Sequence, residues 1–390
     1  MTSLPEDFKA LLTESAGPER ARTVQEALEA PPSVSVRLNP AKLRECPFPE
    51  ATPVPWSPYG YLLKERPVFT LDPFFHAGCY YVQDTSAMYV GHIFRQVTDS
   101  LQPGCQVLDL CAAPGGKTTD LAASLRERFG DAFRLVANEV MRNRYSILCS
   151  NVETWGDPCV STVSRDPSAF GDAPLFDVIL ADVPCSGEGM FRKDAQAVAE
   201  WSLKTVEFCA ARSRRILSDI WPTLRPGGIL LYSTCTFNHF ENDDTVEWIA
   251  RELGADVLPL PDFPPVTATC LGQVLLPGLV PGEGQYVAAL RKQGDSSVCT
   301  GTFQRTRTAP KPASVCTTAS RCTPDAPLVN VDRETALRYL HGDAVVLPED
   351  APLGPVTIGF QGQALGPGKN LGKRCNNLYP KAKRIKMDIR

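Results

Sequence analysis

The sequence predicts an α/β protein whose core is a mostly parallel β-sheet covered by helices. From residue 105 onward, short runs rich in valine, isoleucine and leucine alternate with helical stretches, which is the pattern of βαβ units. Three of these apolar runs lead into glycine-rich or cysteine-containing segments, as expected where a parallel sheet gathers its functional residues. A length of 390 residues allows two or three domains, and 43% hydrophobic with 22% charged residues excludes a mostly disordered chain.

Residues 1–75 are expected to form a small N-terminal region in which helices are followed by irregular chain. Leu4–Leu12 and Ala21–Leu28 have the spacing of short amphipathic helices. Ten prolines lie between Pro31 and Pro73, and proline lacks the amide proton that a helix interior needs. That stretch is therefore not mainly helical.

Residues 76–292 are expected to form the α/β domain. Its predicted strands are Gln106–Leu110, Leu135–Asn138, Cys159–Val163, Asp177–Ala181, Ile229–Ser233 and Gly284–Lys292. Its predicted helices are Thr118–Arg128, Arg142–Asn151, Ala195–Leu224 and Thr245–Leu253. The third of these is read as one long helix that stops at Pro226-Gly227-Gly228.

The C-terminal part is expected to contain a linker and a third, small domain. Residues 293–326 include four serines, seven threonines and three prolines and few large apolar residues, which is typical of a linker. An apolar pattern returns in residues 327–390, so a β-rich domain is expected there. Residues 369–390 contain eight lysines and arginines against Asp388 alone, although the whole chain has a net charge of −4. This basic segment indicates either a nucleic-acid contact or an ordinary solvated tail.

Composition also limits the compartment and the chemistry. No run of about 18 apolar residues occurs and the N-terminus lacks a basic-then-apolar start, so a cytoplasmic protein without a membrane span is expected. The fourteen cysteines include no C-x-x-C pair, and the four histidines are scattered singly. Neither a zinc site nor a disulfide framework is therefore predicted, and no metal is expected.

The first segment that carries chemistry is the glycine-rich turn after the first strand. A buried strand followed by such a turn and a helix presents backbone N–H groups at the sheet edge, which predicts a nucleotide-like ligand. A phosphate-binding Walker A loop would need glycine at Cys111, and no GxGxxG fingerprint is present. The remaining interpretation is the S-adenosylmethionine loop of a methyltransferase. Glu139, at the end of the second strand, would support it by accepting hydrogen bonds from ribose hydroxyls, or is a solvent-facing glutamate.

Two further strand ends each deliver a cysteine to the same edge. Asp182-Val183-Pro184-Cys185 follows one apolar strand, and Ser233-Thr234-Cys235 ends another. A single such cysteine is usually a small buried filler. Two of them, beside small and polar residues, favour nucleophilic catalysis in which a thiolate adds covalently to the substrate.

With these motifs the chain resembles the Sun-domain family of RNA cytosine-5 methyltransferases, and within it the bacterial RsmF-like ribosomal-RNA branch. The resemblance is carried by DLCAAPGGKT at 109–118, DVPCSGEGMFRK at 182–193 and YSTCTFNHFEND at 232–243, with weaker support from 36–40, 81–86 and 282–286. It implies a class I S-adenosylmethionine-dependent methyltransferase with a Rossmann-like, mostly parallel seven-stranded sheet. It also implies a small N-terminal region and a small C-terminal β-rich RNA-binding domain.

The resemblance assigns catalytic roles to four residues. Cys235 is the implied nucleophile, which adds to carbon 6 of cytosine so that carbon 5 can attack the sulfonium methyl group. Cys185 is assigned to breakdown of the adduct and release of the product. Asp182 is expected to hydrogen-bond the cytosine at N3 or its exocyclic amine. Lys117 is expected near the target nucleotide, where it would lower a thiolate pKa.

The resemblance also implies the cofactor and the substrate. S-adenosyl-L-methionine is expected to contact Glu139, Asp166, Asp182 and the turn residues Cys111, Ala112, Ala113, Pro114, Gly115, Gly116 and Lys117. Asp166, which precedes a proline, could equally be a turn residue. The expected substrate is a flipped or single-stranded cytosine in small-subunit (16S) ribosomal RNA, bound by a monomer.

Other functions stay open at this point. One alternative is a tRNA cytosine-5 methyltransferase, and another is a non-catalytic ribosome-assembly factor that binds RNA. A DNA cytosine methyltransferase would use Cys185 as the nucleophile, which the Thr-Cys motif argues against. Phosphate contacts are expected from the basic tail and from five side chains, namely Arg192, Lys193, Arg212, Arg214 and Arg215.

Overall fold

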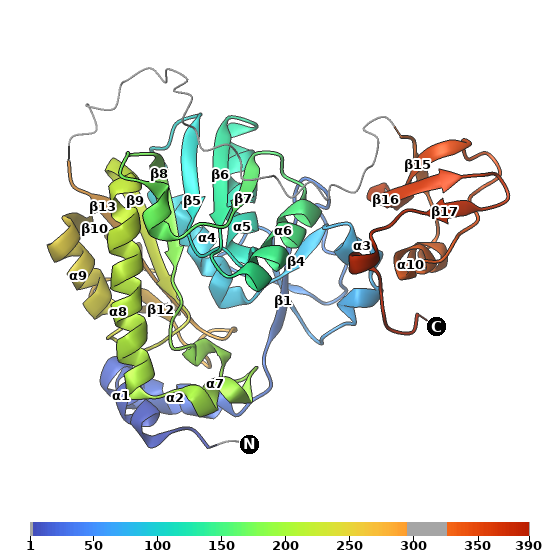
Figure 1. The fold of residues 1–390 in the computed structure, drawn as a ribbon. Coiled ribbons are helices and arrows are strands. Elements are labelled where there is room, and N and C mark those ends of the chain that lie inside the picture. The colour runs from blue at the N-terminus through green and yellow to red at the C-terminus, as the bar shows by residue number, and fades with distance from the viewer. Residues whose placement is uncertain (1–2, 295–325, 390) are drawn as a thin grey trace.

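A computed structural model describes residues 3–294 and 326–389, and Figure 1 shows a central α/β unit between two smaller parts of the chain. The two N-terminal helices lie below one end of the central sheet. A small sheet at residues 34–82 leads to the C-terminal unit on the other side (Figure 1).

The central sheet has the strand order β11-β12-β13-β9-β8-β5-β6-β7, and β10 also pairs with β13. Strands β5 to β9 run parallel, whereas β13 is antiparallel to both β9 and β10. The seven expected strands are therefore present, and the short pair β11–β12 extends the sheet. The bounds are β5 Cys105–Asp109, β6 Phe133–Asn138, β7 Val160–Val163, β8 Phe176–Asp182, β9 Leu224–Thr234, β10 Ala255–Val257, β11 Thr267–Ala268, β12 Gln273–Leu275 and β13 Gln285–Lys292.

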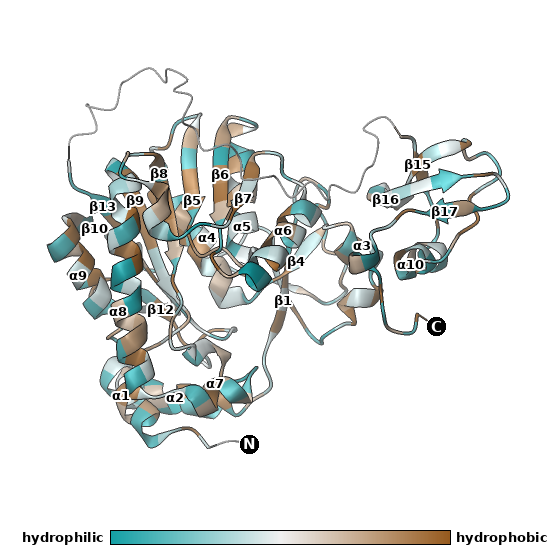
Figure 2. Cartoon of the chain, viewed as in Figure 1, coloured by the Kyte–Doolittle hydropathy of each residue, from teal (hydrophilic) through white to brown (hydrophobic). Residues whose placement is uncertain are grey.

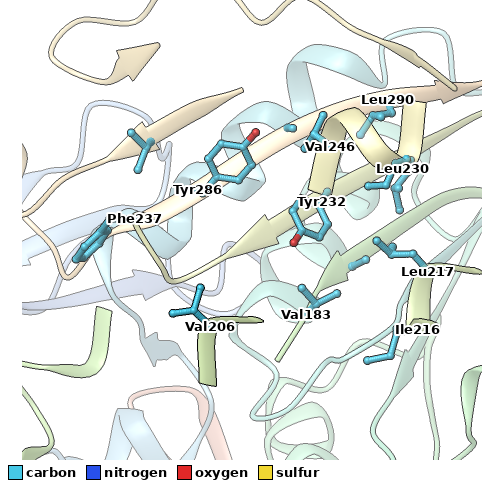
Figure 3. Packing of buried hydrophobic residues seen from close by; sticks show 14 of the residues in the cluster. Val183, Val206, Ile216, Leu217, Leu230, Tyr232, Phe237, Val246, Tyr286 and Leu290 are labelled. Carbon is cyan, nitrogen blue, oxygen red and sulfur yellow. The ribbon is translucent and has the colours of Figure 1, made fainter. Parts of the chain in front are cut away.

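Helices cover both faces of this sheet. Neighbouring residues of a strand point to opposite faces, and in the central strands the side chains on both faces are apolar and need to be buried. Val107 lies in one apolar cluster with α4 and α5, and Leu108 lies in the other with α1, α2, α8 and α9. Figure 3 shows the second cluster, with Tyr232 and Tyr286 at its centre. Figure 2 shows the apolar residues concentrated on the central strands. The helices are α4 Thr85–Val97, α5 Gly116–Phe129, α6 Arg142–Trp155, α8 Leu203–Ile220 and α9 Asp243–Leu253.

The single long helix expected over residues 195–224 is wrong. The structure has α7 at Ala195–Glu200 and α8 from Leu203, because Trp201 is extended and the hydroxyl of Ser202 accepts from the Thr205 amide at 3.2 Å as an N-cap. After a 3-10 turn at Trp221–Thr223, strand β9 begins at Leu224. The segment 226–228 therefore lies inside a strand and does not end a helix.

The N-terminal part is more regular than the proline content suggested. Helices α1 (Glu6–Ala16) and α2 (Pro18–Leu28) pack on the central sheet. The following chain forms a four-stranded sheet in the order β2-β3-β1-β4, with its prolines mostly in the loops. Its strands are β1 Val34–Leu38, β2 Thr52–Pro53, β3 Gly60–Leu63 and β4 Tyr80–Val82. The short helix α3, Pro73–His76, lies between β3 and β4 in the sequence. The expected boundary at residue 75 cuts through this sheet, because β4 pairs with β1.

The C-terminal unit is a small mixed sheet with one helix. It contains β14 Leu328–Asn330, α10 Arg333–His341, β15 Gly354–Phe360, β16 Gln363–Asn370 and β17 Cys375–Asn377. Its apolar core is continuous with that of the N-terminal sheet, and the rings of Phe74 and Phe360 lie 5.2 Å apart. Nearly all of the expected linker 293–326 lies outside the described residues. Within the described ranges, no helix is long and apolar enough to cross a membrane.

Candidate active site

The glycine-rich turn joins β5 to α5 at the carboxyl edge of the sheet. Gly115 caps α5 with a φ of 110°, a conformation that favours glycine. Asn138 holds the turn from the next strand: its carbonyl accepts from the Ala112 amide at 2.8 Å, and its side chain donates to Leu110 O at 3.0 Å. The same side chain donates to Arg165 O at 3.0 Å, so one amide connects three strand-end loops.

A buried arginine fixes the first turn of α5 from behind. Arg37 donates to Gly116 O at 3.1 Å, to Thr119 Oγ1 at 2.6 Å and to Gln83 Oε1 at 2.7 Å. Burial lowers the pKa of Arg37, and Asp120 at 3.8 Å opposes that change. The two weaker sequence motifs, at 36–40 and 81–86, thus meet at the start of the helix that carries Lys117.

Glu139 and Asp166 reach the same edge but differ in their surroundings. The Glu139 side chain is 3% exposed; Oε1 accepts from Met141 N at 2.9 Å, and Oε2 lacks a hydrogen bond although Arg144 Nη1 is 3.3 Å away. A buried carboxylate oxygen with spare capacity fits the ribose hydroxyls of an adenosyl cofactor. Asp166 is exposed and caps a 3-10 helix, where hydrogen bonds from Ser168 lower its pKa.

Asp182, at the end of β8, is surrounded by donors. Lys117 Nζ lies 2.9 Å from its Oδ2, and its Oδ1 accepts from Ser233 Oγ at 2.7 Å and from Gln285 Nε2 at 3.2 Å. Burial would lower the pKa of Lys117, but the Asp182 carboxylate more than offsets it and the pKa is raised. The buried ammonium therefore stays charged, and it also interacts electrostatically with Cys235.

The two motif cysteines form a sulfur pair. Cys185 Sγ and Cys235 Sγ are 3.2 Å apart, and both side chains are partly buried. The hydrogen bond with Cys235, together with burial, raises the pKa of Cys185 well above that of an ordinary thiol. The structure thus brings Lys117, Asp182, Cys185 and Cys235 together, in a cluster where Cys185 is held in its protonated form.

Several residues in this site were not singled out from the sequence. Gln285 also donates to Thr234 O at 2.7 Å, so it connects Asp182 to the residue before Cys235. Glu188 and Glu241 are buried between the two cysteine loops. Glu188 lies in the motif at 182–193 and Glu241 in the motif at 232–243. A charged residue among small and polar residues was the sequence feature that could have pointed to them.

The expected phosphate contacts are mostly engaged elsewhere. Arg192 is buried and donates from Nε to Glu283 Oε2 at 2.6 Å, so its expected role in RNA contact is wrong. Arg212 and Arg214 lie over the rings of Phe208 and Trp248. The lysines and arginines that are exposed in the C-terminal unit are Arg333, Arg338, Lys369, Lys373, Arg374, Lys381 and Lys386. Across residues 3–294 and 326–389, no His, Cys, Asp and Glu cluster could hold a metal ion.

Three family models match the chain. The 16S rRNA methyltransferase RsmB/F model covers residues 97–291, which is half of the chain. The N-terminal domain of 16S rRNA methyltransferase RsmF matches residues 4–85, and the methyltransferase RsmF PUA domain matches residues 326–385.

Curated relatives agree with these matches. The ribosomal RNA small subunit methyltransferase F of Klebsiella pneumoniae (strain 342) is 36% identical over 287 residues, which is 68% of this chain. The same-named protein of Salmonella paratyphi A (strain ATCC 9150 / SARB42) is 35% identical over 288 residues. The chain spans 58% of the length of each of these relatives.

Solved structures confirm the expected class I methyltransferase fold. A methyltransferase homolog protein from Pyrococcus horikoshii has a TM-score of 0.62 at 28% identity, with 74% of this chain and 95% of that chain covered. NSun6 from the same organism has a TM-score of 0.61 at 19% identity, with 75% and 99% covered. The resemblance seen in the sequence motifs is confirmed: the chain belongs to the 16S rRNA methyltransferase RsmB/F family.

Proposed function

We propose that this protein transfers a methyl group from S-adenosyl-L-methionine to carbon 5 of a cytosine in small-subunit ribosomal RNA. The observation that carries the proposal is the pair of cysteine sulfurs 3.2 Å apart beside the Lys117–Asp182 ion pair. Membership of the family and the names of the curated relatives support ribosomal RNA as the substrate.

The cofactor would be held at the carboxyl ends of β5, β6 and β7. The turn Cys111–Lys117 offers backbone groups, Glu139 offers a buried carboxylate oxygen for the ribose, and Asp166 offers a carboxylate on the adenine side. When bound, S-adenosyl-L-methionine supplies an electrophilic methyl group on its sulfonium sulfur. Asp182 borders this space and the cysteine pair, so it would contact both ligands.

Cys235 is the proposed nucleophile. Its thiolate, stabilised by the Lys117 ammonium, adds to carbon 6 of cytosine and makes carbon 5 electron-rich. The Asp182 side chain hydrogen-bonds the cytosine at N3 or at its exocyclic amine, and the Lys117 ammonium beside it offsets the negative charge that develops on the ring. After carbon 5 has gained its methyl group and lost its proton, the bond between Cys235 Sγ and carbon 6 breaks and the double bond returns.

Cys185 serves the last of these steps. Its raised pKa keeps it as a thiol, which is a poor nucleophile but a hydrogen-bond donor. At 3.2 Å from Cys235 Sγ it can donate a hydrogen bond to the thiolate that leaves carbon 6 and so stabilise it. This division of roles explains why one site contains two cysteines.

The RNA must present an unstacked cytosine, because a pocket at a sheet edge cannot reach a base inside a duplex. The exposed lysines and arginines of the C-terminal unit provide the phosphate contacts. All of them except Lys386 lie within residues 326–385, the region matched by the RsmF PUA domain.

The test is nucleoside mass spectrometry after incubation with labelled S-adenosyl-L-methionine. Unmodified 16S RNA, assembled small subunits, tRNA and duplex DNA are compared in parallel. Label in 5-methylcytosine from 16S RNA or small subunits supports the proposal. Label only in tRNA or DNA changes the substrate, and cofactor binding without label in any of the four contradicts the catalytic function.

A further inference from the structure

Two buried carboxylates cross between the loops that carry the cysteines. Glu188, from the loop after β8, accepts from the Phe237 amide in the loop after β9 at 2.6 Å. Glu241, from the loop after β9, accepts from the Ser186 amide in the loop after β8 at 2.9 Å. The exchange is reciprocal, since each loop provides a carboxylate and each receives one. Ser186 directly follows Cys185.

Further hydrogen bonds close this arrangement. Asn238 Nδ2 donates to Glu188 Oε1 at 2.8 Å and to Glu241 Oε1 at 3.0 Å, so it joins the two carboxylates. The Gly189 amide donates to the carbonyl of Cys235 at 2.7 Å. A side chain at Gly189 would meet that carbonyl at 2.8 Å, so the close approach of the loops requires glycine.

Burying these two carboxylates lowers the stability of the folded state. Both glutamates are 1% exposed, and neither has a lysine or arginine among its hydrogen-bond partners. Burial raises the pKa of Glu241 to about 7. Packed apolar side chains would join two loops at lower cost. What a carboxylate adds is direction, because it accepts from a particular backbone N–H and so fixes the main chain beside a cysteine.

We propose that Glu188 and Glu241 are positioning residues that hold Cys185 and Cys235 at their reacting distance through backbone amides of the opposite loop. The catalytic part of this inference rests on the proposed methyltransferase function, whereas the geometric part does not. Neither side chain hydrogen-bonds a sulfur atom, so both position the cysteines through the main chain, and Glu241 in addition acts electrostatically on Cys185. Their removal should therefore change the turnover of bound substrate more than its binding.

The distance between the two sulfurs can be tested without any methyl transfer. Diamide, a thiol oxidant, takes up two electrons and two protons as the two thiols form one disulfide, and the rate of closure reports how well the thiols are aligned. Wild type is compared with Glu241→Ala, Glu188→Ala and Glu241→Gln, and Glu247→Ala removes an exposed glutamate from α9 as the control. Peptide mapping identifies the Cys185–Cys235 disulfide.

The two alanine variants should close the disulfide at least about 10-fold more slowly than wild type, and their kcat should fall about 100-fold with KM for the cofactor nearly unchanged. Glu241→Gln keeps an acceptor oxygen for Ser186 N, but its amide NH₂ group faces the NH₂ group of Asn238, and two donors cannot hydrogen-bond each other. Rates of disulfide closure and turnover between those of wild type and Glu241→Ala are therefore expected. Glu247→Ala should match wild type in both measurements.

Wild-type rates of closure and turnover in both alanine variants would overturn the inference. So would a Glu241→Gln variant that is folded by circular dichroism and as slow as Glu241→Ala, because the retained acceptor would then be irrelevant. If closure depends on the glutamates but wild type methylates none of the tested nucleic acids, the positioning stands and the proposed function fails. The two proposals therefore fail in distinguishable ways.

Discussion

The two sides of the site are built by different means. On the proposed cofactor side, a backbone turn forms the edge together with one buried carboxylate, Glu139, and one exposed carboxylate, Asp166. On the cysteine side, buried Glu188 and Glu241 connect the loops. The proposed cofactor would be exchanged in every turnover and needs an accessible edge, whereas the two sulfurs, in their proposed roles, need a fixed separation. The contrast lies in what the buried carboxylates bind: Glu188 and Glu241 accept from the backbone of the opposite loop, whereas Glu139 keeps one oxygen without a hydrogen bond.

The largest effect is expected on the cysteine side. Cys235→Ala should lower single-turnover methyl transfer by at least about 10⁴-fold, because it removes the proposed nucleophile. Cys185→Ala should still form the adduct but release the product slowly, so that the protein–RNA adduct accumulates on denaturing gels. Cys270→Ala, at an exposed cysteine, is the control. Turnover by Cys235→Ala with no adduct in Cys185→Ala would reverse the two roles.

The next effect concerns the support behind the cofactor turn. Arg37→Ala should lower the free energy of unfolding by about 3–5 kcal/mol, because it leaves the buried Gln83 Oε1 without its donor and removes the cation 3.8 Å from the buried Asp120 carboxylate. Urea denaturation measures the change. Arg22→Ala, on the exposed face of α2, should behave like wild type. An unchanged urea midpoint in Arg37→Ala would show that the glycine-rich turn is stable without the hydrogen bonds of Arg37.

A smaller effect separates the two carboxylates of the cofactor side. Glu139→Ala should weaken S-adenosyl-L-methionine binding by about 10- to 100-fold, as expected for lost charge-assisted hydrogen bonds. Asp166→Ala should weaken it less, because Asp166 is exposed and already bonded to Ser168. Calorimetric titration of both variants measures the difference. Equal losses would remove the distinction between a buried and an exposed cofactor contact.

The smallest effect, when measured over one pH unit, is a pH dependence at the end of β5. Burial raises the pKa of Asp109 to about 7, while the unfolded carboxyl ionises near about 3.9. The folded state therefore binds this proton more tightly, and stability is lost as the pH rises from about 4 to 7, by at most about 1.4 kcal/mol per pH unit. Asp109→Asn should flatten this slope in urea titrations at successive pH values. A slope identical to that of wild type would contradict a raised pKa.

The sequence predicted the central sheet and the meeting of the motif residues for one reason. Strands β5, β8 and β9 are apolar runs, and the carboxyl ends of parallel strands share an edge, so residues after them must be neighbours. That rule needs no knowledge of side-chain partners. It placed Lys117, Asp182, Cys185 and Cys235 at one edge, where their sulfur and charge contacts are now seen.

Features that depend on partners distant in the sequence could not be predicted in this way. The break at Trp201 is accompanied by a hydrogen bond from its indole to Glu188, in another loop. Glu188 and Glu241 find their backbone donors 49 and 55 residues away. The small N-terminal sheet was hidden because its prolines dominate the composition while its strands are only two to five residues long.

The shared core of the two outer parts of the chain has a consequence for biosynthesis. The ring of Phe74 packs on Phe360, and Arg333 donates to Leu71 O at 2.9 Å. A growing chain completes the first of these surfaces long before the second exists, and at roughly 5–20 residues per second the delay is roughly 10–50 s. During that interval an apolar face near Phe74 stays uncovered, which makes the half-made chain a natural client for chaperones that bind nascent polypeptides.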